Sequence, residues 1–211
     1  ISEKIHDTML KSLALCVLLI AVSGVVKVSP ALSSQSTLVV IFSLALGALF
    51  GEVVDIDARL QRFGNRIEAR LKGRGGRVSE GFVTASLVFC VGAMAVVGSL
   101  ESGLTGDHKT LFAKSVIDGI SSVVFTSALG IGVMLSAVSV FLYQGAITLA
   151  AGSLKAVLTD RAVTEMTAVG SMLIFVIGLN MLGATKVKVA NLLPAVAGPV
   201  IFQAFLFILG R

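Results

Sequence analysis

Apolar residues along this chain are gathered into seven long runs that short polar segments separate. A helix that crosses a lipid bilayer needs about 20 predominantly apolar residues, and each run is close to that length. The runs are continuous rather than alternating, as in LALCVLLIAV at Leu13–Val22, which favours helices over the strands of a membrane barrel. The pattern predicts transmembrane helices at about Met9–Val26, Leu38–Val54, Phe82–Leu100, Ser115–Val133, Leu135–Leu154, Val163–Leu182 and Ala190–Leu209.

Composition agrees with this pattern. Charged residues make up 14% of the chain and hydrophobic residues 55%, whereas a soluble domain carries about 25% charged residues. The longest polar connection, about Asp55–Gly81, is too short for a soluble domain. We therefore expect an all-α, polytopic membrane helix bundle that forms one integral membrane domain over residues 1–211.

The basic residues divide unequally between the two sides of the predicted bundle. Counted by alternating loops, one side carries 11 Lys and Arg and the other carries 6. Cytoplasmic loops of membrane proteins carry the excess of positive charge, so loop 55–81 is predicted to be cytoplasmic. Because the net charge of +5 follows the membrane topology, we expect no nucleic-acid partner.

The cytoplasmic loop contains an amphipathic helix of its own, at about residues 55–72. Apolar residues recur every three or four positions from Ile56 to Leu71, and the glycine-rich stretch Gly73–Gly76 ends the pattern. A second row consists of Arg59, Arg62, Arg66 and Arg70. This helix is expected to lie in the interface with its arginines on anionic head groups. It would serve as a topology anchor or, alternatively, as a regulatory or partner-binding helix.

A weak internal repeat relates two of the spans. Residues 11–24 and 85–98 match without gaps at seven of fourteen positions, including Cys16 with Cys90 and Gly24 with Gly98. A fainter third copy starts at Thr159 and resembles the segment that starts at Ser2. Transporter folds are often built from such repeats, with the binding site at the repeat interface.

Polar side chains inside the spans are the candidates for function, because ionisable groups in hydrocarbon need a reason to be there. Lys114 and Asp118 are four residues apart on one helix face and can pair, either as an interfacial pair or as an ion or proton site. Gln144 is the deepest strongly polar residue. It would serve either as an inter-helix hydrogen bond or as a ligand-facing amide. Asn180 and Gln203 add two further amides.

Two other features concern helix ends and breaks. Glu165 is expected near the start of the sixth span, where a carboxylate suits the helix dipole. Pro194 and Pro199 fall inside the seventh span, where each removes a backbone donor. The carbonyls near Ala190 and Ala195 would then be free to coordinate a cation, as in broken transporter helices. A plain kink that improves packing is the alternative.

The sequence contains no motif that is typical of soluble enzymes. No spacing matches a zinc protease, a P-loop, a Rossmann fingerprint or a nucleophile elbow. Cys16 and Cys90 are interpreted as small packing residues, and His6 and His108 are too isolated to form a metal site. We therefore expect no enzyme activity, no cofactor and no metal. Small-residue spacings such as Gly47-xxx-Gly51 permit close helix contact.

Several segments together resemble a known family over essentially the whole chain. They are FVTASLVFCVGAMAVVGSLESGLTGDH (Phe82–His108), KSVIDG (Lys114–Gly119), LGIGV (Leu129–Val133), YQGAITLAAG (Tyr143–Gly152), TEMTAVGS (Thr164–Ser171) and GLNMLGATKVKVANLLPA (Gly178–Ala195). The chain resembles the YqgA-like family of uncharacterised bacterial inner-membrane proteins, a family defined by a domain of unknown function. The resemblance implies a multi-pass protein of the bacterial inner membrane. Members usually begin with one more apolar segment, so an eighth, N-terminal span is expected to be missing here.

The leading functional hypothesis is a small secondary transporter or channel for a monovalent cation or a small polar solute. Its site would lie near the bilayer midplane at the proline-broken helix and use Lys114, Asp118, Gln144, Asn180, Pro194, Pro199 and Gln203. The alternative is a non-transporting scaffold or sensor that binds anionic lipid at the cytoplasmic face through Arg59, Arg62, Arg66 and Arg70. A chain this small is expected to form a homo-oligomer in order to enclose a pathway.

Overall fold

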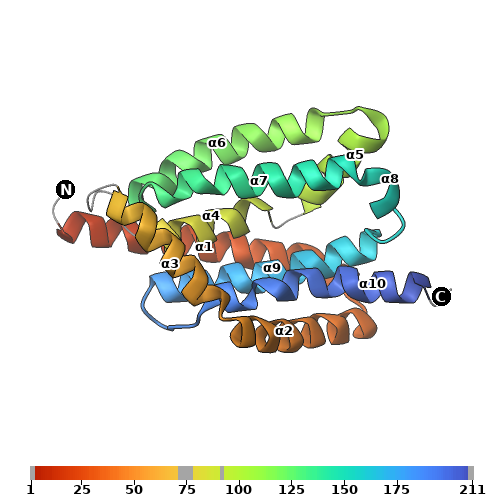
Figure 1. Cartoon of the computed structure of the whole chain (residues 1–211), viewed down its shortest axis with the longest axis horizontal. Coiled ribbons are helices and arrows are strands. Elements are labelled where there is room, and N and C mark those ends of the chain that lie inside the picture. Colours follow the sequence, from red (N-terminus) through yellow and green to blue (C-terminus); the bar gives the residue numbers. More distant parts are fainter. Residues whose placement is uncertain (1–2, 71–77, 91–92, 209–211) are drawn as a thin grey trace.

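The computed structural model describes residues 3–70, 78–90 and 93–208 as helices joined by short connections (Figure 1). In chain order they are α1 Glu3–Val28, η1 Ser29–Ala31, α2 Ser34–Val54, α3 Ile56–Arg70, α4 Val78–Cys90, α5 Ala93–Thr105, α6 Lys109–Leu129, α7 Gly132–Leu149, α8 Ala151–Leu154, α9 Asp160–Met181, η2 Val189–Ala197 and α10 Gly198–Ile208. The long helices run side by side along one axis. We call the two ends of this bundle the α3 end and the α8 end (Figure 1).

The predicted membrane spans are confirmed as helices. Within the described residues, six helical stretches are long and apolar enough to cross a bilayer, and α4 with α5 raises the number to seven if the pair counts as one span. Large apolar side chains are exposed along the outer faces of the bundle, as at Phe42, Phe141 and Ile208. In a multi-pass membrane protein these faces contact lipid.

Two predicted spans differ in detail from the observed helices. The fourth span ends at Leu129 rather than Val133, because Gly130 adopts a positive φ of 77° and turns the chain. A positive φ is costly for residues other than glycine, so this pair of glycines with Ile131 between them is a turn and not an unwound intramembrane stretch. The third span is not one straight helix, because α4 and α5 meet at an angle of 59°.

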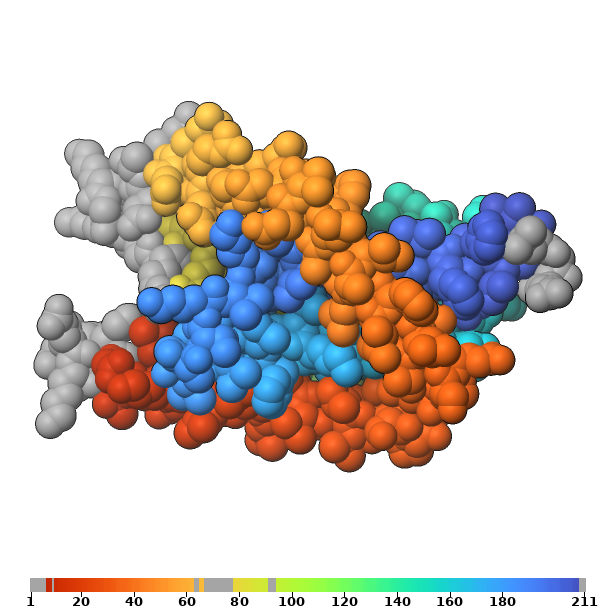
Figure 2. Space-filling view, turned by 90° about the horizontal axis from the view of Figure 1, so that it is seen from below, coloured from red at the N-terminus to blue at the C-terminus, as the bar shows by residue number. Residues whose placement is uncertain are grey.

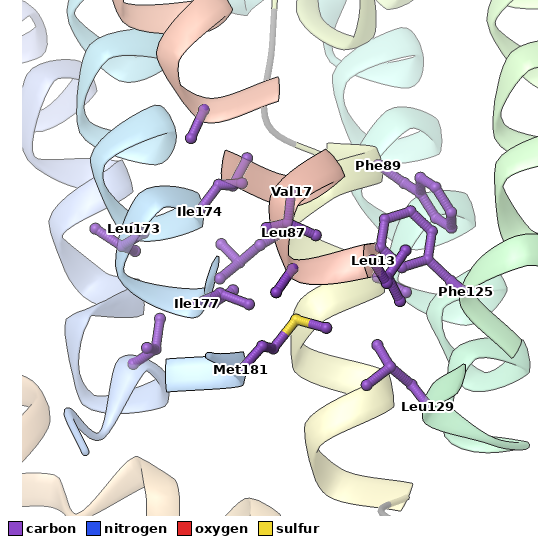
Figure 3. Close-up of a cluster of buried hydrophobic side chains, with 14 of the residues drawn as sticks. Leu13, Val17, Leu87, Phe89, Phe125, Leu129, Leu173, Ile174, Ile177 and Met181 are labelled. Atoms are coloured by element: carbon purple, nitrogen blue, oxygen red, sulfur yellow. The ribbon is translucent and has the colours of Figure 1, made fainter. Parts of the chain in front are cut away.

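Helix α9 lies at the centre of the bundle. Its most apolar window is 67% buried, compared with 17–28% for the other unbroken spans. Alanine, glycine and serine lie on several faces of α9, and they let neighbouring helices approach closely. Figure 3 shows Ile174 and Ile177 of α9 on the side of Val17 of α1 and Leu87 of α4 in the main apolar core, with Leu173 on the other side of α9.

The predicted small-residue contact at Gly47 and Gly51 is confirmed. Both glycines of α2 lie against the backbone of η2, where a Cβ on Gly51 would stand 1.8 Å from the carbonyl oxygen of Asn191. The amide of Asn191 then links three segments, because its Nδ2 donates to Glu52 (2.5 Å) and its Oδ1 accepts from the backbone of Asp57 (2.7 Å). The α2–η2 pair is thereby fixed at the α3 end.

The seventh span is broken, as the prolines predict. Residues 189–197 form a 3-10 helix that contains Pro194, and an α-helix continues from Gly198. One expectation is corrected. The carbonyl of Ala195 is not free, because it accepts a hydrogen bond from the backbone N–H of Gly198. A 3-10 helix pairs each carbonyl with the third residue onward, so it reuses acceptors that an α-helix would leave open.

The amphipathic helix expected after the second span is confirmed as α3. It packs against α4 and η2, and the side chains of Arg59, Arg62 and Arg66 are exposed. Arg70 ends the helix. Its side chain and the glycine-rich stretch at 73–76 lie outside the part of the chain that the structure describes.

Candidate functional site

Polar side chains with buried atoms lie toward the α8 end of four helices. Lys114, Gln144, Glu165 and Gln203 are each five residues from that end of their own helix, counted from Lys109, Leu149, Asp160 and Ile208. At 1.5 Å per residue each lies about 8 Å along its helix, and the four helices end at different points along the bundle axis (Figure 1). We call these four residues, with Asp118, the polar layer.

Glu165 is the most deeply buried member of the polar layer. Its side chain is 0% exposed, although it carries a carboxylate inside an apolar bundle. Arg161, one turn earlier on α9, donates through Nε to Oε1 at 3.0 Å, and Oε2 has no hydrogen-bond partner among the described residues. An unpaired oxygen of a buried carboxylate is costly, so it marks a place for a proton, a water molecule or a cation.

Lys114 and Asp118 form the ion pair that their spacing predicts. The Lys114 side chain is 9% exposed and that of Asp118 22%, so the pair lies within the bundle and is not a surface pair. The Cys90 thiol at the end of α4 is within electrostatic range of both charges, and Tyr143 of α7 is within range of Cys90. The pair therefore stands close to the point where the third span bends.

Gln144 and Gln203 complete the layer. The Nε2 atom of each is buried and has no hydrogen-bond partner within the described part of the chain, so the structure shows no inter-helix bond from either nitrogen. Tyr143, next to Gln144, packs in one apolar cluster with Val200, which precedes Gln203 by one turn of α10. Two unpaired amide nitrogens, which are donors, and one unpaired carboxylate oxygen, which is an acceptor, are groups that can bind a small polar species.

A second polar region lies at the opposite end of the bundle. A cavity of about 320 Å³ opens at the α3 end, and we call it the vestibule. Its polar lining comes from Asp57, Gln61 and Asn65 of α3, Ser79, Glu80 and Thr84 of α4, and Asn180 of α9. Asp57 and Glu80 are the two acidic groups of this lining, and α3, which carries Asp57, also carries the exposed Arg59, Arg62 and Arg66.

Asn180 and the prolines lie apart from the polar layer. Asn180 lines the vestibule, and its side chain holds the connection to η2 by accepting from the backbone of Val187 and donating to the carbonyl of the same residue. Pro194 faces a groove beside α2, and Pro199 is buried at the start of α10. The structure thus places Lys114, Gln144 and Gln203 toward the α8 ends of their helices, with Asp118 paired to Lys114, whereas Asn180 is near the α3 end.

The main apolar core separates the vestibule from the polar layer. Ile177 borders the vestibule and belongs to the core. Leu173 and Ile174, one turn closer to Glu165 on α9, are 1% and 3% exposed. Passage between the two polar regions therefore requires these side chains to move (Figure 3).

Sequence reasoning missed the importance of Glu165. Its position suggested a helix-dipole role, but α9 begins at Asp160, so Glu165 is beyond the first turn, to which that effect is confined. The signal was present in the flanking residues, because Thr167, Ala168, Gly170 and Ser171 put small side chains around most of the helix. A helix that can be packed on every side is expected at the centre of a bundle, and a carboxylate within it, such as that of Glu165, is then buried.

Metal binding has no support in the described residues, where no group of three histidine, cysteine or acidic side chains is placed to hold an ion. Monovalent cations, protons and polar solutes need no such cluster. They can use carboxylate and amide oxygens of the kind found in the polar layer.

Comparison with known proteins places the chain among uncharacterised membrane proteins. Residues 1–204 match the family described as "Protein of unknown function (DUF554)". The uncharacterized membrane protein YdfK of Bacillus subtilis (strain 168) is 30% identical over 199 residues, which are 94% of this chain and 83% of YdfK. The uncharacterized protein YqgA of Escherichia coli (strain K12) is 27% identical over 160 residues, which are 74% of this chain and 68% of YqgA. No solved structure matches the chain.

Proposed function

The chain belongs to the DUF554 family of proteins of unknown function, and we propose that it is a small membrane transporter or channel for a monovalent cation or a small cationic solute. The observation that carries the proposal is the carboxylate of Glu165, which is 0% exposed in the central helix and has one oxygen without a partner. Ionisable groups at such positions in membrane proteins commonly mark ion or proton pathways.

The arrangement of the two polar regions supports this function. The vestibule has a polar lining at the α3 end, which the distribution of Lys and Arg predicts to be cytoplasmic. The polar layer has Glu165 and Asp118 toward the other end, and Gln144 and Gln203 lie toward the same end of their own helices. A cation would enter at one region and be held at the other, and movement at the apolar core would alternate access between them.

The unpaired oxygen of Glu165 gives the proposal its preference for a cation. Lys114 pairs with Asp118 and Arg161 with Oε1 of Glu165, and Arg161 also lines the groove beside α2. A bound cation at Oε2 of Glu165 would satisfy a buried carboxylate oxygen that has no partner among the described residues.

The experiment is cation flux into liposomes that contain the purified protein, with Na⁺, K⁺ and a pH gradient tested separately. We expect one of these to be transported, and we expect Glu165→Gln and Asp118→Asn to slow it at least tenfold. Asp107→Asn is the matched control, because this carboxylate is exposed in the connection between α5 and α6 at the same end. Wild-type flux in both test variants, or no flux of any cation, would refute the proposal.

The alternative is a scaffold or sensor that acts through α3. The exposed arginines Arg59, Arg62 and Arg66 favour it, because basic residues at a membrane surface attract anionic lipid. If Gln at these three positions abolishes the cellular phenotype while cation flux in liposomes is unchanged, the scaffold explains the function better than transport does.

A further inference from the structure

A long apolar groove runs along the surface of the bundle between α2 and the η2–α10 span. It encloses about 1210 Å³, and Phe42, Leu46 and Phe50 of α2 face Ile201, Phe202 and Phe205 of α10 across it. From Gln35 to Phe50 the groove follows sixteen residues of α2, which is about 22 Å. Figure 2 shows this side of the molecule, with α2 in orange and the dark-blue end of α10 beside it.

One end of this groove is polar and positively charged. Gln35, at the start of α2, and Arg161, at the start of α9, line it at the α8 end. Arg161 contacts Glu165 through Nε, and the second oxygen of Glu165 takes no part. A guanidinium has five N–H donors, so this single contact leaves four of them for another acceptor. The side chain of Arg161 is 40% exposed, which makes the remaining donors reachable from the groove.

We propose that the groove binds one phospholipid, with its acyl chains along α2 and α10 and its phosphate on Arg161. The groove matches an amphiphile in shape and polarity, because its long apolar part ends at an arginine with free hydrogen-bond donors. Arginine binds phosphate oxygens with two parallel hydrogen bonds, which suits a head group better than a single ammonium would. This site is at the α8 end and is therefore separate from the basic helix α3.

The charged end of the groove favours a lipid over a second copy of the chain. A second copy would have to place a carboxylate on Arg161 while its apolar side chains filled the groove beside α2 and α10. A phospholipid supplies the anion and the apolar chains together.

The test is native mass spectrometry of the detergent-purified protein with added phosphatidylglycerol, phosphatidylcholine or diacylglycerol. We expect one molecule of phosphatidylglycerol to be retained at least tenfold more strongly than diacylglycerol, which has no phosphate. Leu46→Trp, which places a larger side chain in the groove, should reduce retention at least tenfold.

Arg161 needs a variant pair, because Arg161→Gln alone leaves the Glu165 carboxylate without its partner. The double variant Arg161→Gln/Glu165→Gln removes both charges, and we expect it to fold and to lose the preference for phosphatidylglycerol. Lys155→Gln is the control, since Lys155 is exposed and follows α8 at the same end of the bundle. The readout is bound mass, so its result is independent of the transport proposal.

Three results would overturn the lipid site. One is equal retention of the three lipids by the wild-type protein. Another is unchanged preference in the double variant, or an equal loss in Lys155→Gln. The third is a dimer that Leu46→Trp dissociates without changing lipid retention, which would make the groove an interface between two copies.

Discussion

The contact of α2 with η2 is tight enough to predict the effect of one methyl group. A Cβ on Gly51 would lie 1.8 Å from the carbonyl oxygen of Asn191 and 2.9 Å from its Cα, whereas ordinary contacts to a Cβ begin at 3.4 Å. Gly51→Ala must therefore push the two segments apart. The atoms in the way belong to the backbone, so no side-chain rotation relieves the clash.

The expected cost has two parts. Added volume in a packed interior destabilises by about 1–3 kcal/mol. The displacement also acts on the hydrogen bonds of the Asn191 amide to Glu52 and Asp57, and one such bond contributes about 1 kcal/mol. Alanine in a helix regains up to about 1 kcal/mol over glycine. We expect Gly51→Ala to lower the free energy of unfolding by about 1–3 kcal/mol.

Gly119→Ala is the matched control. Gly119 is exposed within α6, and a Cβ there would meet nothing within 4 Å. This variant gains the higher helix propensity of alanine without the clash, so we expect it to be as stable as the wild type or up to about 1 kcal/mol more stable. Both are measured as unfolding curves in mixed detergent and dodecyl sulfate micelles, followed by circular dichroism. Equal stability of the two variants would refute the close packing of α2 on η2.

Three other contacts give predictions of similar size. Lys114→Met leaves the Asp118 carboxylate within the bundle without its partner and should lower the free energy of unfolding by about 3–5 kcal/mol. The double variant Lys114→Met/Asp118→Leu should have a free energy of unfolding within about 1 kcal/mol of the wild type. A single variant as stable as the wild type would show that the pair is not buried. Asn180→Ala removes the hydrogen bonds that hold the connection from α9 to η2, so trypsin should cut there several times faster than in the wild type, and an unchanged digestion rate would contradict this. Ser86 donates to Ser139 across α4 and α7 at 3.1 Å, so a double-mutant cycle with alanine should give a coupling of about 0.6 kcal/mol, and a coupling of zero would mean that this bond does not form.

The architecture could be predicted from the sequence because its determinants are local. An apolar run long enough to span the bilayer must be a helix, so each span follows from its own residues. In the same way, the alternation of apolar residues and arginines predicts α3 from its own residues. The bend between α4 and α5 was not predicted, because the run Phe82–Leu100 is apolar throughout and its own pattern does not show how its neighbours pack.

The polar layer could be predicted only in part, for the same reason. The Lys114–Asp118 pair depends on a spacing of four within one helix, which the sequence states directly. The burial of Glu165 depends on the helices around α9, and so does the burial of the Nε2 atoms of Gln144 and Gln203. Such relations join residues far apart in the chain, and no single segment contains them.

Arg161 contacts both sites proposed for this protein, the polar layer and the lipid groove. Its position therefore bears on which helices move when access changes. It holds Glu165 from the groove side, and its remaining donors face the groove between α2 and α10. Because α9 is the most buried span and α10 is among the least buried, a change of access is more easily made by α10 moving against α9 than the reverse. A phospholipid in the groove would then contact both the fixed helix, through Arg161, and the mobile one, through Ile201 and Phe205. Because Arg161 can keep its Nε contact with Glu165 while its other donors bind the phosphate, an occupied groove should hold Arg161, and with it the Glu165 carboxylate, in place.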